Sequence, residues 1–315
     1  MKLIEFSQHF PDEASCKAEF KLYREAQGVV CKKCATKNQY WWLASKEQYE
    51  CKNCGFRMSL KSGTVMENSK LPYQYWFIAF HLMTSTKKTI SALELQRQIG
   101  HKYYEPIWAM MHKIRLVMGK RDDQYKLTNE IEADESYYST RYIQEENEFT
   151  GQKEELKRGK GSQRKTGVLV MASQQRKVHS NPTKKKNVFY NAPKFLKMKL
   201  VENGTANEIK KTAESIADKQ VRVKTDKAKS YPKAFENFKK LEMFDMSKFD
   251  SGKVLPWVSK AITNSKNLLK AIHHAIEDKY LQNYLNEFCY KYNRRYFGDK
   301  VFNRLLICAV SQVWY

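Results

Sequence analysis

Four of the seven cysteines form two closely spaced pairs near the start of the sequence. Cys31 and Cys34 make one Cys-x-x-Cys pair, and Cys51 and Cys54 make a second pair after a spacer of 16 residues. Thiolates at this spacing typically ligate one tetrahedral zinc ion, although four buried, reduced cysteines are the alternative. Because sulfur would fill all four positions, we predict one structural zinc ion. The other three cysteines stand in apolar surroundings, which favours simple burial: Cys16, Cys289 and Cys308.

Two aspartates follow short apolar patterns that predict strands. In residues 131–134 apolar and acidic side chains alternate and end on Asp134, which should point away from the apolar side. In residues 221–226 the apolar side chains share one face, and Asp226 ends the pattern. Carboxylates that meet at strand ends can hold hard divalent cations. A single aspartate at such a place more often caps a turn, so the pair carries the hypothesis.

The charge of the chain predicts a polyanionic partner. Lys plus Arg is 57 and Asp plus Glu is 34, which gives a formal net charge of +23. With 13% aromatic residues, this surplus favours nucleic acid over disorder. The longest apolar run, residues 75–83, is about half of the roughly 20 residues that span a bilayer, and no signal peptide is evident. We therefore expect a cytoplasmic protein.

Several helices should position these residues. The sequence predicts a short capped helix that ends at Gly28, a buried helix over 71–83, and a helix that begins at Ser91 and ends at Gly100. A further helix should open at Pro106, so residues 91–118 form a possible helix-turn-helix; any two-helix hairpin in a core would show the same pattern.

The second half of the sequence alternates between strand and helix patterns. Residues 167–172 are apolar at every position, which is typical of a strand covered on both faces. A helix is predicted over 206–219, and helical spacing returns over 262–276. Between the first two strands lies a basic, glycine-containing stretch that should be an exposed loop and a contact for DNA phosphates, with Lys157, Arg158 and Lys160.

Several motifs resemble those of insertion-sequence DNA transposases that carry an N-terminal zinc ribbon. Their order also matches that family, and they extend over roughly residues 10–310. They are Ala133–Tyr137, Thr225–Asp226 followed by Tyr231, Leu255–Val258, Asn264–Lys266, Tyr284–Phe288 and Tyr292–Arg295.

The resemblance implies a fold, a catalytic triad and partners. The fold would be a multidomain α+β or α/β arrangement: a helical segment (1–28), a zinc ribbon (29–63), a helix-turn-helix-like region (70–120) and a ribonuclease-H-like mixed sheet flanked by helices (128–310). A DDE-type triad of Asp134, Asp226 and Asn264 would bind two Mg²⁺ or Mn²⁺ ions. The partners would be double-stranded DNA, both terminal inverted repeats and target, with a homodimer or higher oligomer in the complex.

Other residues bear on this resemblance. Lys266 and Lys270 would contact DNA phosphates near the triad. Related sequences often have histidine near Ser259 and glycines where residues 227–229 stand, so catalytic competence is less strongly implied than the fold. Two further carboxylates are weaker candidates than Asn264 for the third ligand, namely Glu135 and Glu277.

Two other functions fit part of the sequence. A non-catalytic zinc-ribbon regulator, or a domesticated inactive transposase, would explain the charge and the cysteines but not the strand-end aspartates with the downstream Asn264. A ribonuclease-H-like nuclease or resolvase would cut DNA without joining it. Joined products from pre-cut ends distinguish that enzyme from a transposase.

Overall fold

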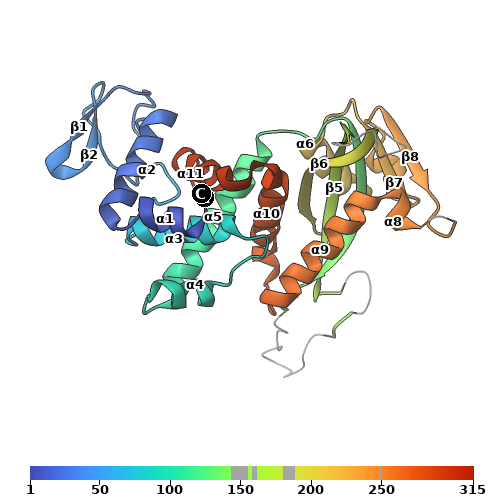
Figure 1. The fold of residues 1–315 in the computed structure, drawn as a ribbon. Coiled ribbons are helices and arrows are strands. Elements are labelled where there is room, and N and C mark those ends of the chain that lie inside the picture. The colour runs from blue at the N-terminus through green and yellow to red at the C-terminus, as the bar shows by residue number, and fades with distance from the viewer. Residues whose placement is uncertain (143–154, 158–161, 180–188, 249) are drawn as a thin grey trace, which may run out of the picture. The chain divides into compact units, whose positions relative to one another are not determined.

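The chain forms two compact units in the computed structural model, which describes residues 1–142, 155–157, 162–179, 189–248 and 250–315. The first unit comprises residues 1–122 together with 294–315, and the second comprises residues 123–293 (Figure 1). The chain therefore leaves the first unit once and returns to it. Within the described residues, no helix combines the length and apolarity that crossing a membrane requires.

The first unit is built mainly from helices. The predicted N-terminal helix is present as α2, which begins after the Asp12 cap and ends at Gly28, where a φ of 95° suits glycine. The short helix α1, which precedes it, was not predicted. The bounds of the helices are α1 Leu3–His9, α2 Glu13–Gln27, α3 Tyr73–Ser85, α4 Ala92–Ile99, α5 Tyr104–Asp123 and α11 Val301–Ser311.

The helices expected to read DNA form close to their predicted positions. The Ser91 hydroxyl accepts a hydrogen bond from the Glu94 amide at 3.0 Å, and α4 ends at Gly100 in the left-handed region. The next helix, α5, begins at Tyr104 and not at Pro106. Proline is tolerated within a first helical turn because the amides there have no intrahelical partner, so the helix can start two residues earlier.

An aromatic cluster holds the start and the end of the chain together in the first unit. Phe302, on α11, lies 5.9 Å from the ring of Phe6, 5.7 Å from Phe10 and 6.1 Å from Phe77, measured between ring centroids. Helix α11 packs against α2 and α3 (Figure 1). The C-terminal residues are therefore part of this core.

The predicted ribbon is a small antiparallel sheet. Its strands are β1 Tyr40–Leu43, β2 Gln48–Cys51 and β3 Arg57–Ser59, in that order, with the turn η1 Ala44–Lys46 between the first two. Arg24 of α2 is buried against it and donates a hydrogen bond to the Ser59 carbonyl at 2.9 Å.

The second unit contains a mixed five-stranded sheet, which confirms the predicted class of a mixed sheet flanked by helices. The strands are β4 Glu130–Ser139, β5 Lys165–Val178, β6 Phe189–Val201, β7 Arg222–Asp226 and β8 Lys240–Phe244. Their order is β6-β5-β4-β7-β8. The first three pair antiparallel, while β7 pairs parallel with both β4 and β8.

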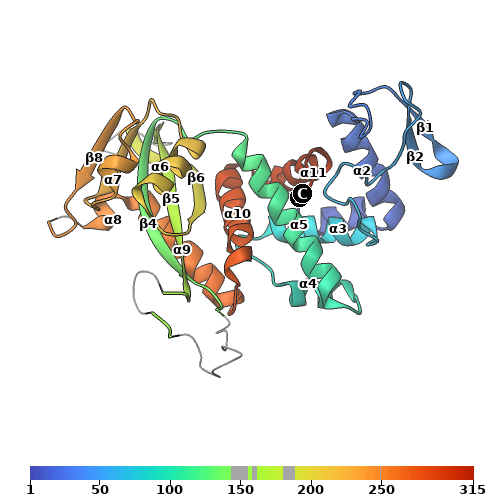
Figure 2. The ribbon, with the colours of Figure 1, turned by 180° about the vertical axis from the view of Figure 1, so that it is seen from behind.

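Helices cover both faces of this sheet. Leu169 and Met171 of β5 pack on the face of α6 and α7, while Val168 and Val170 pack on the face of α9 and α10. The all-apolar stretch 167–172 is thus a strand buried on both sides, as predicted. Helix α9 crosses the near face of the sheet in Figure 1, and Figure 2 shows the opposite face with α6. The helices of this unit are α6 Ala206–Ile216, α7 Tyr231–Ala234, α8 Ser251–Val254, α9 Pro256–Ile272 and α10 Asp278–Arg294. The 3₁₀ helix η3, Arg295–Lys300, belongs to the first unit.

Candidate functional site

Asp134 and Asp226 occupy equivalent positions on two neighbouring parallel strands. The parallel ladder between β4 and β7 pairs Glu130 with Arg222 and continues in step to Glu132 and Lys224. Two residues further along each strand, the same register reaches Asp134 and Asp226. Neighbouring strands lie about 4.8 Å apart, so both carboxylates leave the sheet at one place.

The electrostatics of Asp134 reflect this arrangement. Burial, together with the neighbouring Asp226 and Glu135 carboxylates, raises the pKa of Asp134 to about 6, although the backbone amide of Glu135 and the charge of Lys266 oppose that effect. Asp226 is half-buried, and one of its carboxylate oxygens accepts a hydrogen bond from the Ala228 amide at 3.1 Å. Two carboxylates that repel one another are a donor set that a hard divalent cation would stabilise.

Glu132 joins the strand of Asp134 to helix α9. It is 1% exposed, and its Oε2 accepts hydrogen bonds from the Trp257 amide at 2.8 Å and the Val258 amide at 3.0 Å. These amides belong to the first turn of α9, where backbone donors have no intrahelical partner. Because side chains alternate along a strand, Glu132 and Asp134 face the same side, toward α9.

A second contact fixes α9 further along the same strand. The Tyr138 hydroxyl lies 2.7 Å from the Ser265 hydroxyl, and Ser265 donates to the Ala261 carbonyl at 2.8 Å. Tyr138 again shares the face of Asp134. Helix α9 is therefore tied to β4 at positions on either side of Asp134.

Asn264 and Lys266 flank Ser265 on this anchored helix. Asn264 is exposed, so its amide faces solvent. Lys266 is half-buried; burial and Lys165 lower its pKa, against the opposing effect of Asp134. Its ammonium lies 5.4 Å from the centre of the Tyr138 ring.

The four paired cysteines come together in the ribbon. Their sulfur atoms all lie within 4.8 Å of one another, with 3.6 Å between Cys31 and Cys54 and between Cys34 and Cys51. Zinc–sulfur bonds of about 2.3 Å in a tetrahedron separate sulfurs by about 3.8 Å, so the four thiols fit that ion. Hydrogen bonds with the Thr36 hydroxyl and amide lower the pKa of Cys34, which favours the thiolate that a metal requires. Burial and the three neighbouring sulfurs raise the pKa of Cys54, so a cation at the centre would be needed to hold all four as thiolates.

The two cysteine pairs have the same backbone conformation. In one, the Cys31 carbonyl accepts from the Ala35 amide at 2.9 Å; in the other, the Cys51 carbonyl accepts from the Gly55 amide at 2.9 Å. Both residues that follow the second cysteine have positive φ, 57° at Ala35 and 68° at Gly55. Two matching turns facing each other are the local origin of the four-sulfur cluster. The three remaining cysteines are buried and form no disulfide.

The second unit matches a known family of domains. A comparison with protein-family models matches residues 126–293 to the ISXO2-like transposase domain, which is more than half of the 315 residues. The chain belongs to the ISXO2-like transposase family. A search of curated proteins and a search of solved structures each gave no match. The matched region of this transposase nearly coincides with the second unit, residues 123–293.

The structure of the transposase domain separates the other candidate carboxylates from Asp134. Glu135 alternates with Asp134 along β4 and so faces the opposite side of the strand. Glu277 forms an ion pair with Lys279 at 2.8 Å, and its backbone forms an isolated β-bridge with Arg141. Arg141 follows Asp134 by seven residues, which corresponds to roughly 20 Å at about 3.3 Å per residue of extended chain.

The basic residues expected to contact DNA are spread over the transposase domain. Lys157 and Lys270 are exposed, and the Lys157 amide donates to the Gln163 side chain at 3.0 Å. Arg158 and Lys160 lie outside the described residues. Glu132 is the residue that sequence reasoning missed; its alternation with Ile131 and Ala133 was visible, but its partner helix was not.

Proposed function

We propose that this transposase cleaves DNA at transposon ends and joins those ends to target DNA in a Mg²⁺-dependent reaction. The family supports transposition in general. The observation that carries the proposal is the position of Asp134 and Asp226 at the same level of two neighbouring parallel strands. Both carboxylates are half-buried and Asp226 disfavours the charged form of Asp134, so a bound cation would stabilise the pair. Cleavage and joining are both in-line displacements at phosphorus, so one ribonuclease-H-like site can serve both steps.

Each residue of the site would have its own role in the reaction. Asp134, Asp226 and the amide oxygen of Asn264 would hold Mg²⁺ or Mn²⁺, with two ions in the site. Such ions lower the pKa of water and stabilise charge on the phosphate. Glu132 holds the helix that carries Asn264, and Lys266 would neutralise charge on DNA beside Asp134.

We propose that the first unit recognises DNA. One zinc ion in the four-cysteine cluster would hold the ribbon rigid, and α4 with α5 would act as a helix-turn-helix on the terminal inverted repeats. Lys157 and Lys270 would contact phosphates. Because two transposon ends must be handled together, the DNA complex would contain at least a dimer.

A cleavage assay on labelled duplexes that carry the cognate ends tests the aspartates. Asp134→Asn and Asp226→Asn should bind DNA as the unchanged protein does and fail to cut it with Mg²⁺. Asp218→Asn is the matched control, because Asp218 is exposed in the same unit. Binding without nicking by the unchanged protein would favour a non-catalytic regulator. Unchanged cutting by Asp134→Asn would overturn the assignment of the site.

A second pair of variants tests the amide. Asn264→Ala should reduce Mg²⁺-dependent cutting strongly, whereas Asn267→Ala, an exposed neighbour on the same helix, should leave it unchanged. Equal activity in the two variants would remove Asn264 from the triad. Pre-cut ends offered with target DNA should yield joined products; their absence alongside normal cutting would indicate a nuclease.

A further inference from the structure

Glu67 lies in the segment that joins the ribbon to the helices of the first unit. This segment, residues 60–72, follows β3 and leads into α3. Glu67 is 8% exposed, and its carboxylate accepts hydrogen bonds from the Gly63 amide at 3.0 Å and from the Tyr315 hydroxyl at 2.8 Å. The same carboxylate forms an ion pair with Lys32. One nearly buried charge therefore has partners in three separate parts of the sequence.

The backbone carbonyl of Glu67 has further partners outside the ribbon. It accepts hydrogen bonds from the Lys113 ammonium at 3.0 Å and from the Trp314 indole N–H at 3.2 Å. The Lys113 ammonium also lies 4.2 Å from the centre of the Trp314 ring. Lys113 belongs to α5, so Glu67 connects the ribbon to the second helix of the proposed helix-turn-helix. We call these residues the Glu67 network: Lys32, Glu67, Lys113, Trp314 and Tyr315.

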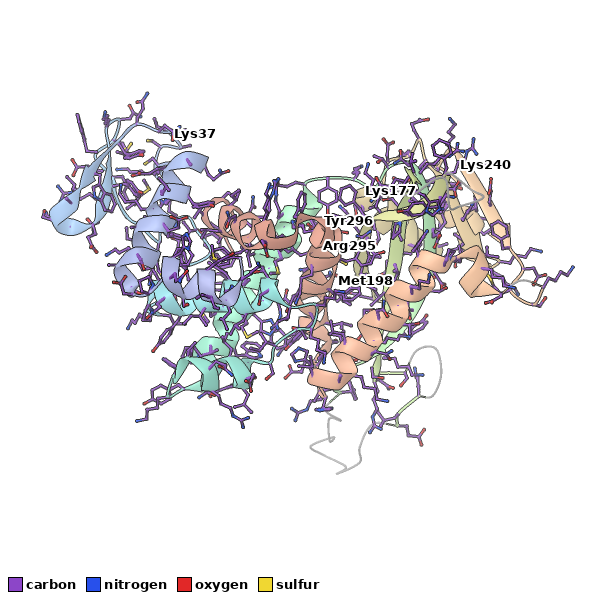
Figure 3. The ribbon with its side chains drawn as sticks, in the orientation of Figure 1. Lys37, Lys177, Met198, Lys240, Arg295 and Tyr296 are labelled. Carbon is purple, nitrogen blue, oxygen red and sulfur yellow. The ribbon has the colours of Figure 1, made fainter. Side chains whose placement is uncertain are left out.

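Lys32 connects the Glu67 network to the cysteine cluster. It stands inside the first Cys-x-x-Cys pair, and its amide donates to the sulfur of Met58 on β3 at 3.4 Å. The turn that carries Lys32 is closed by a β-bridge between Val30 and Lys37, and Figure 3 labels Lys37 in the ribbon. A short turn that is closed at its base and bonded to a strand moves as one piece. The ion pair of Lys32 therefore acts on the whole ribbon.

The ribbon is also held at a second place, by α2. The buried Arg24 donates hydrogen bonds to the carbonyls of Ser59 and Leu60, where β3 ends. A rigid body attached at one point can still swing about that point, whereas two separate attachments fix its direction. The Glu67 network supplies the second attachment and so determines where the ribbon points relative to α5.

We propose that the Glu67 network fixes the spacing between two DNA segments that the transposase contacts at one transposon end. The ribbon would contact one segment, and α4 with α5 would contact the other. The inference rests on the proposed recognition of transposon ends by the first unit. Glu67 is a positioning residue in this arrangement, because it acts on both DNA-contacting parts from a buried place. An end whose two segments are moved apart should engage only one part at a time.

Duplexes with base pairs inserted between the two segments test the proposal on the full chain. Footprinting on the cognate end first locates both segments. An insertion of five base pairs is about half a helical turn, so it moves one segment to the opposite face of the DNA. The unchanged protein should then bind about 100-fold more weakly, because the second contact no longer adds to the first.

Glu67→Ala should weaken binding and also tolerate the insertion. Its affinity for the unmodified end should fall about tenfold, and the insertion should lower that affinity by no more than about threefold further. Trp314→Ala removes a donor and the ring beside Lys113, so it should have the same effect from the other side of Glu67. A residue that only stabilised the fold would leave the full sensitivity to the insertion in place.

Glu19→Ala is the matched control, because Glu19 is a half-buried glutamate of α2 in the same unit. It should keep both the affinity and the sensitivity to the insertion. Circular dichroism and zinc content check that the Glu67 variant is folded. If it is not, Trp314→Ala and Glu67→Gln decide the question; the glutamine keeps an acceptor for the Gly63 amide and removes the charge that pairs with Lys32.

Two results would overturn the proposal while end recognition stands. One is a 100-fold loss on insertion in the folded Glu67 and Trp314 variants. The other is equal binding of both duplexes by the unchanged protein. Failure of the unchanged protein to bind the cognate end at all would instead overturn the recognition on which the proposal rests.

Discussion

Replacing Glu132 by glutamine should alter how the stability of the transposase depends on pH. Burial raises the pKa of Glu132 from 4.5 to about 7, although the amides of Val258 and Trp257 oppose that effect. The folded chain therefore binds more protons than the unfolded chain between these pH values, and its stability falls as pH rises through that window. At about 1.4 kcal/mol for each pH unit, the loss reaches about 3 kcal/mol above pH 7.

Glu132→Gln keeps an acceptor for the two amides and removes the charge. The variant should match the unchanged protein below about pH 4.5 and exceed it by about 3 kcal/mol at pH 8. Urea denaturation from pH 4 to 8, in buffer without added Mg²⁺, measures the difference. Glu202→Gln, at an exposed site of the same unit, should show no such trend. Parallel stability curves for the Glu132 variant and the unchanged protein would refute the reasoning.

Three other changes have defined outcomes. The purified chain should contain one zinc ion per molecule, as measured by elemental analysis. The variant Cys54→Ser should lose this zinc, whereas Cys289→Ala should keep it. Equal zinc contents in the two variants would contradict the four-sulfur site. Tyr138→Phe should lower the free energy of unfolding by about 1 kcal/mol, because the hydroxyl of Ser265 loses one partner, and an unchanged urea midpoint would count against that contact. Gly167→Ala should destabilise the chain by about 1–3 kcal/mol, because the new methyl group would lie 2.8 Å from the backbone carbonyl oxygen of Val201 on β6. An unchanged melting temperature would show that β5 and β6 can move apart at this position.

Features that depend on short stretches of sequence were predictable. The two Cys-x-x-Cys turns are local, so their spacing was enough to predict the four-sulfur cluster. The alternation over 131–134 likewise predicted that Asp134 leaves the sheet away from the apolar side. The register that brings Asp226 beside it required knowledge of strand order, which the sequence pattern alone does not contain.

Other features depend on contacts between distant residues. Glu132 looked like a solvent-facing acid because alternation alone shows one apolar face, whereas α9 covers the second face and buries it. Helical spacing predicted α9 only from 262, but the helix begins at Pro256 because Glu132 supplies partners for its first amides. No periodicity indicated that residues 294–315 belong with the first unit.

That return of the chain makes the second unit an insertion within the sequence of the first unit. The first unit lacks α11 until residues 301–311 have been synthesised, so during translation residues 123–293 can fold before the first unit is complete. A frameshift or stop codon shortly after residue 293 would consequently spare the sheet with Asp134 and Asp226. It would remove α11 and Phe302 from the first unit, leaving a product in which the second unit keeps its core and the first unit has lost its last helix.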